Sequence, residues 1–187
     1  DDPFVTAAPA ADPAPVKHVQ NVFQLPNRSG PADNDNIKQA VVNFGAVYTG
    51  MRWNEAAFSE TNAAYYYSGG EVSNHGVVIA GWDDNFDKNK FPTVPPGNGA
   101  FLGKNSWGPA FGQAGYFWIS YYDTRICQEL TVFLNAEPVS NYARVYQYDP
   151  LGCIMRLGFS GATAWMANVF TAEADESVAA VGFYANT

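Results

Sequence analysis

The sequence predicts an α+β protein that is mainly antiparallel β-sheet with one packed helix. Aromatic residues make up 16% of the chain and charged residues only 15%, and aromatic side chains favour the faces of sheets. The apolar runs are also short and bounded by Gly, Asn or Pro, as strands usually are. A hydrophobic content of 47% over 187 residues is enough for a packed core.

The chain begins with a segment that favours neither helix nor strand. Residues 1–16 are rich in Ala, Pro and Asp, and repeated prolines prevent a continuous helix, so we expect an extended arm. In residues 17–25, Val19, Phe23 and Leu25 alternate with polar neighbours over part of the run. This alternation predicts a half-buried strand.

Residues 33–44 are predicted to form the helix. Asp33 or Asn34 can cap its start, and the glycine at position 45 can end it. The side chains of Ile37, Val41 and Phe44 share one face at helical spacing. We therefore expect this face to pack on the sheet.

Five further strands are expected, separated by turn-forming residues and by a polar, proline-rich excursion at 83–99. They lie at residues 46–51, 76–82, 100–104, 115–121 and 130–134.

The character of the chain changes near residues 135–142, where a polar linker contains Pro138. Short segments at 143–148, 164–171 and 177–184 then predict a C-terminal β segment. The predicted domains are an arm at 1–16, a lobe at 17–140 and a partial module at 141–187. Because about 45 residues lie near the lower limit for an independent core, the last part either packs on the first domain or is the start of a second.

Charge and hydropathy exclude two classes of partner. The net charge is −8, and no basic patch is visible, which argues against nucleic acid. No apolar run approaches the roughly 20 residues that a membrane-spanning helix needs. The acidic composition suits an extracellular or cell-surface protein, although composition alone leaves the compartment open.

The two cysteines, Cys127 and Cys153, are too few for a disulfide framework and lack the spacing of metal ligands. Two buried thiols are favoured, then a single disulfide, and last a catalytic thiol. Asp83 and Asp84 are expected in a solvated loop and His18 on the surface, so no metal and no cofactor are predicted.

Two motifs carry the candidate chemistry. Residues 73–84 (SNHGVVIAGWDD) place His75 at the start of an apolar strand, and residues 104–108 (KNSWG) place Asn105 two positions before Trp107. A histidine and an asparagine are two of the three members of a Cys-His-Asn site.

Together with residues 112–117 (GQAGYF), these motifs resemble the His and Asn signatures of papain-like cysteine peptidases. Residues 36–40 (NIKQA) and 45–47 (GAV) resemble the helix and strand before that histidine, and the resemblance runs from about residue 17 to 134. It implies the C-terminal, barrel-like lobe of a two-lobed peptidase. His75 would be the general base and proton donor, Asn105 would orient its ring, and Trp107 would shield their bond from water.

The resemblance also implies substrate-binding residues. These are Val47, Ser73, Asn74 and Gly76, of which Val47, Ser73 and Gly76 match positions that line the family's main specificity pocket. The sequence does not indicate which substrate is preferred.

The family's nucleophile would be absent from this chain. In the family it lies in a Cys-Gly-Ser/Ala-Cys-Trp/Tyr motif about 130 residues before the histidine, which is about 55 positions before Asp1. No such motif occurs in these residues.

A weaker resemblance concerns residues 146–152 and 164–171, which are similar to the beginning of a lectin-like β-sandwich found after some bacterial papain-like peptidases. Ordinary β packing is an equally good interpretation, and sugar binding stays open.

The leading hypothesis is the His/Asn half of a secreted papain-like peptidase that is inactive as this chain alone and that cleaves peptide or protein substrates when a cysteine lobe is supplied. The alternatives are a non-catalytic binding homologue and a two-chain enzyme whose other chain carries the cysteine. We also expect the lobe interface to expose an apolar, Tyr- and Trp-rich patch, and the chain to self-associate through it.

Overall fold

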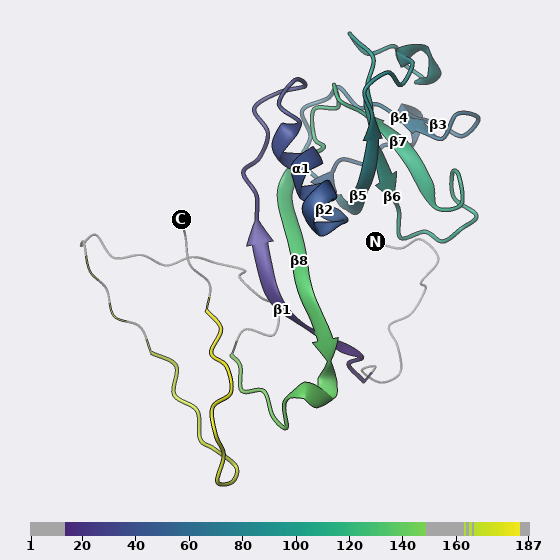
Figure 1. The fold of residues 1–187 in the computed structure, drawn as a ribbon. Coiled ribbons are helices and arrows are strands. Elements are labelled where there is room, and N and C mark those ends of the chain that lie inside the picture. Colours follow the sequence, from purple (N-terminus) through teal and green to yellow (C-terminus); the bar gives the residue numbers. More distant parts are fainter. Residues whose placement is uncertain (1–13, 149–162, 164, 166, 184–187) are drawn as a thin grey trace.

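The computed structural model describes residues 14–148, 163, 165 and 167–183 (Figure 1). Its strands are β1 (Lys17–Gln24), β2 (Val47–Met51), β3 (Phe58–Ser59), β4 (Ala64–Tyr65), β5 (His75–Asp83), β6 (Ala100–Lys104), β7 (Tyr116–Ser120) and β8 (Gln128–Pro138). Its helices are α1 (Asp35–Phe44) and the 3-10 turns η1 (Glu55–Ala57), η2 (Lys88–Lys90) and η3 (Val139–Asn141). The predicted arm at 1–16 lies almost wholly outside the described residues.

All eight strands belong to one sheet in the order β1-β8-β2-β5-β6-β7-β4-β3. Every neighbouring pair is antiparallel except β4 and β7, which are parallel. The predicted fold class, mainly antiparallel sheet with one α-helix, is confirmed for the described part of the chain. The two-residue strands β3 and β4 were not predicted, because they are too short to show a periodic pattern.

The start of α1 differs in detail from the prediction. Asn34 is the N-cap residue, but its side chain makes no capping hydrogen bond. Its Oδ1 accepts from Nη1 of Arg28, and its Nδ2 donates to the carbonyl of Pro31. The amide therefore fastens the preceding loop to the helix instead of satisfying the helix N–H groups. At the other end, the N–H of Gly45 donates to the carbonyl of Val41, as expected of a helix end.

The buried face of α1 is also rotated from the predicted one. Ile37 and Ala40 are buried against the sheet and Val41 is half-buried, whereas Phe44 is 43% exposed and meets Phe23 edge to face. The helix contacts β2, β5 and β8. The core beneath it is formed by Val47, Met51, Val77, Ile79, Phe101, Phe117, Ile119, Leu130 and Val132.

β1 is an edge strand that pairs only with β8, and the two run side by side as a long ribbon (Figure 1). The predicted half-buried strand is more exposed than expected, because Val19 and Phe23 are 44% and 48% exposed. Phe133 on β8 is exposed as well. Val19, Phe23 and Phe133 thus form a group of exposed apolar side chains on this ribbon, away from His75.

The described residues after Asn141 form neither helix nor strand, so the described parts of the β segments expected at 143–148, 164–171 and 177–184 are not strands. Side-chain contacts hold these residues together instead of a hydrogen-bonded ladder. Tyr148 stacks on Phe170, and Arg144 forms ion pairs with Glu173 and Glu176. The domain boundaries stay a prediction.

No helix among the described residues has the length and apolar character needed to cross a membrane.

Candidate active site

The pairing of β5 with β6 brings the two motifs together. Val78 lies opposite Lys104 in this antiparallel register, so His75, three residues before Val78, falls beside the residues that follow Lys104. Asn105 is fixed there by its own backbone, whose N–H donates to the carbonyl of Gly115 over 2.9 Å. A strand pairing therefore delivers both side chains to one end of the sheet.

The hydrogen bonds of Asn105 determine which imidazole nitrogen carries the proton. Its Oδ1 accepts the backbone N–H of Ser106 over 2.8 Å and lies 2.9 Å from Nε2 of His75. Since this oxygen can only accept, Nε2 must be the donor and carry the proton. Nδ1 of His75 is then the nitrogen available to a partner.

The environment of His75 favours the neutral ring. Burial lowers its pKa from the usual 6.5, while the bond to Asn105 acts in the opposite direction. A neutral imidazole with a free Nδ1 is the form that takes up a proton, and the amide oxygen at Nε2 then stabilises the resulting cation.

Trp107 covers this pair. Its ring lies 4.9 Å from the imidazole between centroids, at 37°, and Asn105 is only 3% exposed. An apolar cover strengthens a hydrogen bond by lowering the local dielectric. The geometry thus places Trp107 where it shields the His75–Asn105 bond.

Trp53 completes the cover, and no pattern in the sequence points to it because it belongs to neither motif. Its ring stacks on Tyr65 at 4.9 Å and meets Trp107 edge to face at 4.7 Å, with His75 at 6.1 Å. The side chain of Asn74 binds both backbone groups of Trp53. Its Oδ1 accepts from the Trp53 N–H over 2.6 Å, and its Nδ2 donates to the Trp53 carbonyl over 3.2 Å. The residue before the histidine therefore positions the tryptophan that packs beside it.

Two donors at this site have no acceptor among the described residues. Both Nδ2 of Asn105 and Nε1 of Trp107 are buried and without a hydrogen-bond partner. Such groups are rare in native proteins and cost free energy when left alone.

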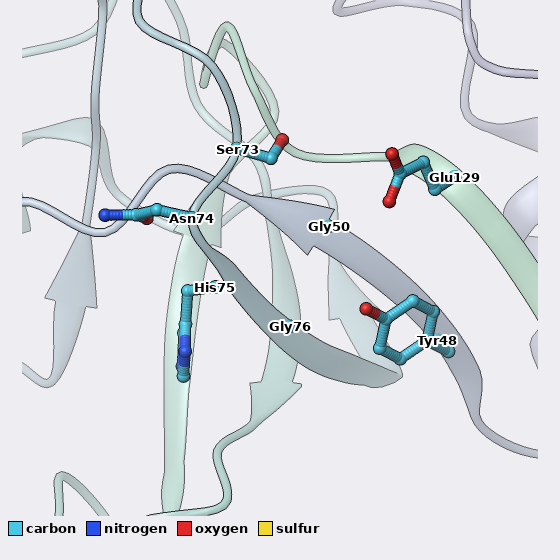
Figure 2. A pocket seen from close by; sticks show the side chains of 7 residues that line it. All are labelled: Tyr48, Gly50, Ser73, Asn74, His75, Gly76 and Glu129. Atoms are coloured by element: carbon cyan, nitrogen blue, oxygen red, sulfur yellow. The ribbon is translucent and has the colours of Figure 1, made fainter. Parts of the chain in front are cut away.

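Beside His75 lies a pocket of about 280 Å³. It is lined by Tyr48, Gly50, Ser73, Asn74, His75, Gly76 and Glu129 (Figure 2). Three of the predicted substrate-binding residues, Ser73, Asn74 and Gly76, line it. Val47 does not, because its side chain points into the core and is fully buried.

Cys127 is not placed to react. It is a free thiol that is fully buried, and desolvation raises its pKa to about 12. A thiol acts as a nucleophile only as the thiolate, so Cys127 is a packing residue. Cys153 lies outside the described residues.

The acidic pair at 83–84 has structural partners. Asp84 forms an ion pair with Lys38 at 2.5 Å and accepts from the Tyr121 hydroxyl over 2.8 Å, while Asp83 accepts the N–H of Asn85. Across the described ranges, no three His, Cys, Asp or Glu side chains are grouped as metal ligands. His18 lies in β1 opposite Glu137, far along the ribbon from the site motifs.

Comparison with known families agrees with this geometry. The model described as papain family cysteine protease matches residues 7–133, which is more than half of the chain. The chain belongs to the papain family of cysteine proteases. The match is followed by one to a lectin-like domain over residues 145–187.

The solved structures include a protein with the same two kinds of domain. Two solved structures of Cwp84 superpose on the chain. The first, of the cysteine protease and lectin-like domains of this surface layer associated protein of Clostridium difficile, has 30% identity, a TM-score of 0.58 and 66% of this chain covered. The second, after propeptide cleavage, has 32% identity, a TM-score of 0.59 and 68% covered. Cysteine protease Amb a 11.0101 of Ambrosia artemisiifolia is 31% identical over 115 residues, which is 61% of this chain. The chain spans 27%, 32% and 27% of these three relatives, in that order.

Proposed function

We propose that His75 and Asn105 are the base and the orienting residue of a Cys-His-Asn peptidase site. The observation that carries this is the 2.9 Å contact between Nε2 of His75 and Oδ1 of Asn105, which leaves Nδ1 free for a thiol. The papain family cysteine protease match supports it.

In the proposed reaction Nδ1 of His75 takes the proton of the cysteine thiol, and the thiolate attacks the peptide carbonyl carbon to form a C–S bond. The imidazolium then donates its proton to the amine nitrogen as the C–N bond breaks. A water molecule, deprotonated by the neutral ring, attacks the acyl carbon and releases the acid and the thiolate. Throughout, Asn105 holds Nε2–H and stabilises the charged ring.

We propose further that the nucleophile comes from a segment other than these 187 residues and that the chain alone is inactive. Cys127 is excluded by its burial, and neither Cys127 nor Cys153 lies in a Cys-Gly-Ser/Ala-Cys-Trp/Tyr motif. The unpartnered donors of Asn105 and Trp107 support a second segment packing at this site, because an acceptor from it would satisfy them.

The test uses the protein expressed from the complete open reading frame that contains these residues. We expect it to hydrolyse peptide amides and to react with a thiol-directed probe, and His75→Ala to lower kcat/KM by about 10²–10⁴. His18→Ala is the matched control and should change nothing. Hydrolysis that survives His75→Ala would refute the assignment.

A degenerate binding protein is the competing function. It shares the fold and the pocket, so peptide binding without hydrolysis or probe labelling by the complete protein would favour it. A two-chain enzyme would instead show activity only when a second, cysteine-bearing polypeptide co-purifies.

We propose an extracellular or cell-surface location, supported by the surface layer association of the similar protein Cwp84, and peptide or protein substrates. Self-association also stays a proposal, and sedimentation over a concentration series tests it. In the described sheet region, the large apolar side chains that are exposed include Phe23 and Phe133 of the β1–β8 ribbon, whereas Trp53 and Trp107 are half-buried.

A further inference from the structure

The pocket beside His75 contains one charged side chain, that of Glu129. Figure 2 shows the Glu129 carboxylate, the Ser73 hydroxyl and the Tyr48 ring on the same side of the start of β5, while the Asn74 amide extends the other way. At about 280 Å³ the pocket is smaller than most small-molecule sites, which are about 300–1,000 Å³. Its size suits a single side chain of a bound peptide.

An irregularity in β8 delivers Glu129 to the pocket. Tyr48 of β2 pairs with Thr131, but Gly50 pairs with Gln128, so β8 carries one extra residue between these points. Glu129 lies in this bulge with a φ of 56°, a left-handed conformation that is unfavourable for a residue other than glycine. Bulges of this kind re-aim side chains beside active sites.

The bulge is held in place by a side chain from a distant part of the sequence. Oδ1 of Asn27 accepts the Glu129 backbone N–H over 3.0 Å. The backbone therefore presents Glu129 in one fixed place.

Two glycine residues, Gly50 and Gly76, border the pocket beside Glu129. A Cβ on Gly50 would lie 3.5 Å from both Oε2 of Glu129 and Oγ of Ser73, and a Cβ on Gly76 would lie 2.8 Å from the Tyr48 ring. Any side chain at Gly50 would extend into the space between the carboxylate and the hydroxyl. The volume beside Glu129 exists because Gly50 has no side chain, whereas the space beside Gly76 is taken by the Tyr48 ring.

The carboxylate has no cationic partner of its own. Among the described residues, no Lys or Arg lies within ion-pair distance of Glu129. Arg52, the basic residue that follows β2, is paired with Glu71 at 2.5 Å. An apolar side chain entering the pocket would strip water from the carboxylate without replacing its hydrogen bonds, which is unfavourable.

We propose that this pocket binds the cationic side chain of a Lys or Arg residue of the peptide substrate, and that Glu129 determines this preference. The inference rests on the proposed peptidase function and specifies its substrate class. The ammonium or guanidinium group pairs with the Glu129 carboxylate, and the Ser73 and Tyr48 hydroxyls accept its remaining hydrogen bonds. The aliphatic stem lies along the open face of Gly50.

The test compares peptides that differ at one position at a time on the N-terminal side of the scissile bond, carrying Lys, Arg, norleucine or Glu. With the complete protein, we expect one position at which Lys and Arg raise kcat/KM about tenfold over norleucine. Glu129→Gln should abolish this preference, Glu129→Lys should reverse it in favour of Glu, and Glu60→Gln, at an exposed glutamate away from the pocket, should leave it intact. Added salt should weaken the preference.

Failure of this inference can be told from failure of the peptidase function. Hydrolysis without a cationic preference, or a preference that survives Glu129→Gln, overturns the inference and leaves the function standing. If no peptide is hydrolysed, binding of the Lys and norleucine peptides, followed by NMR shifts of the Ser73 and Glu129 amides, decides the point. Tighter Lys binding lost in Glu129→Gln supports the pocket assignment, and equal binding overturns it.

Discussion

The side-chain oxygen of Asn105 lies 2.9 Å from Nε2 of His75 and also accepts the backbone N–H of Ser106. The second bond decides the direction of the first, because it fixes which end of the amide faces the ring. An aspartate at position 105 would place a negative charge beside Nε2. A rotated amide would place an N–H donor there instead of an acceptor. The tautomer of His75, and so the nitrogen that can meet a thiol, follows from a backbone N–H.

The titration of His75 tests this electrostatic arrangement. Burial lowers its pKa below 6.5, so the unfolded state binds the proton more readily. The contribution of neutral His75 to the free energy of unfolding is therefore full above about pH 6.5. It is lost as the pH falls through the pKa of the folded state. NMR of the imidazole protons in a His18→Gln background, which leaves one histidine, should give a midpoint below 6.5.

Asn105→Asp in the same background should raise the His75 pKa above that of the parent, because a carboxylate beside Nε2 favours the cation. Asn105→Ala should not raise it, since it removes the one contact that favours the charged ring. An upward shift in both variants would show that solvent entry, and not the amide oxygen, controls the titration.

Trp53 is expected to act on His75 through packing. Trp53→Leu removes the ring that stacks on Tyr65 and meets Trp107, so water should reach the imidazole and its pKa should rise toward 6.5. The free energy of unfolding should fall by about 2–4 kcal/mol from the lost burial. Urea denaturation and the NMR titration measure the two effects.

Trp118→Leu is the matched control for Trp53→Leu. Trp118 packs in the separate cluster with Phe86, so this change should destabilise the protein without moving the His75 pKa. Equal pKa shifts in the two variants would mean that general loosening explains both.

The motifs at His75 and Asn105 were recognisable in the sequence because they resemble the His and Asn signatures of the papain family and flank apolar runs that predict strands. The supporting residues were not. Trp53 reaches the site through a loop, and its partners Tyr65 and Asn74 become visible only when that loop is folded. Aromatic residues are common in this sequence, so no local pattern distinguishes the one that packs beside the histidine.

The place of Glu129 in the pocket could not be predicted from the sequence. A strand with regular alternation would place it on one face by simple counting, but the extra residue in β8 breaks the count. Val47, which the resemblance placed in the pocket, points into the core for a simpler reason: side chains alternate along β2, and the neighbouring Tyr48 and Gly50 lie on the pocket side. Register sets the face of each strand residue, and a one-residue slip reverses it.

Gly76 is expected to be intolerant of a side chain because Tyr48 occupies the space. A Cβ there would lie 2.8 Å from the ring, so Gly76→Ala should cost about 1–3 kcal/mol of stability. Tyr48→Ala should relieve this cost. A double-mutant cycle by urea denaturation should show coupling of about 1 kcal/mol or more between the two changes, and strict additivity would refute the contact.

Asp123 should be among the most important carboxylates for stability. It is buried, and its oxygens accept the backbone N–H groups of Tyr67, Arg125 and Ile126 at 2.8–2.9 Å. Asp123→Ala leaves three donors without an acceptor, so the free energy of unfolding should fall by about 2–4 kcal/mol. Asp35→Ala is the control, because this exposed residue lies in the first turn of α1 and should cost less than about 1 kcal/mol. Similar losses in the two variants, measured by urea denaturation at pH 7, would show that the turn holds without its carboxylate.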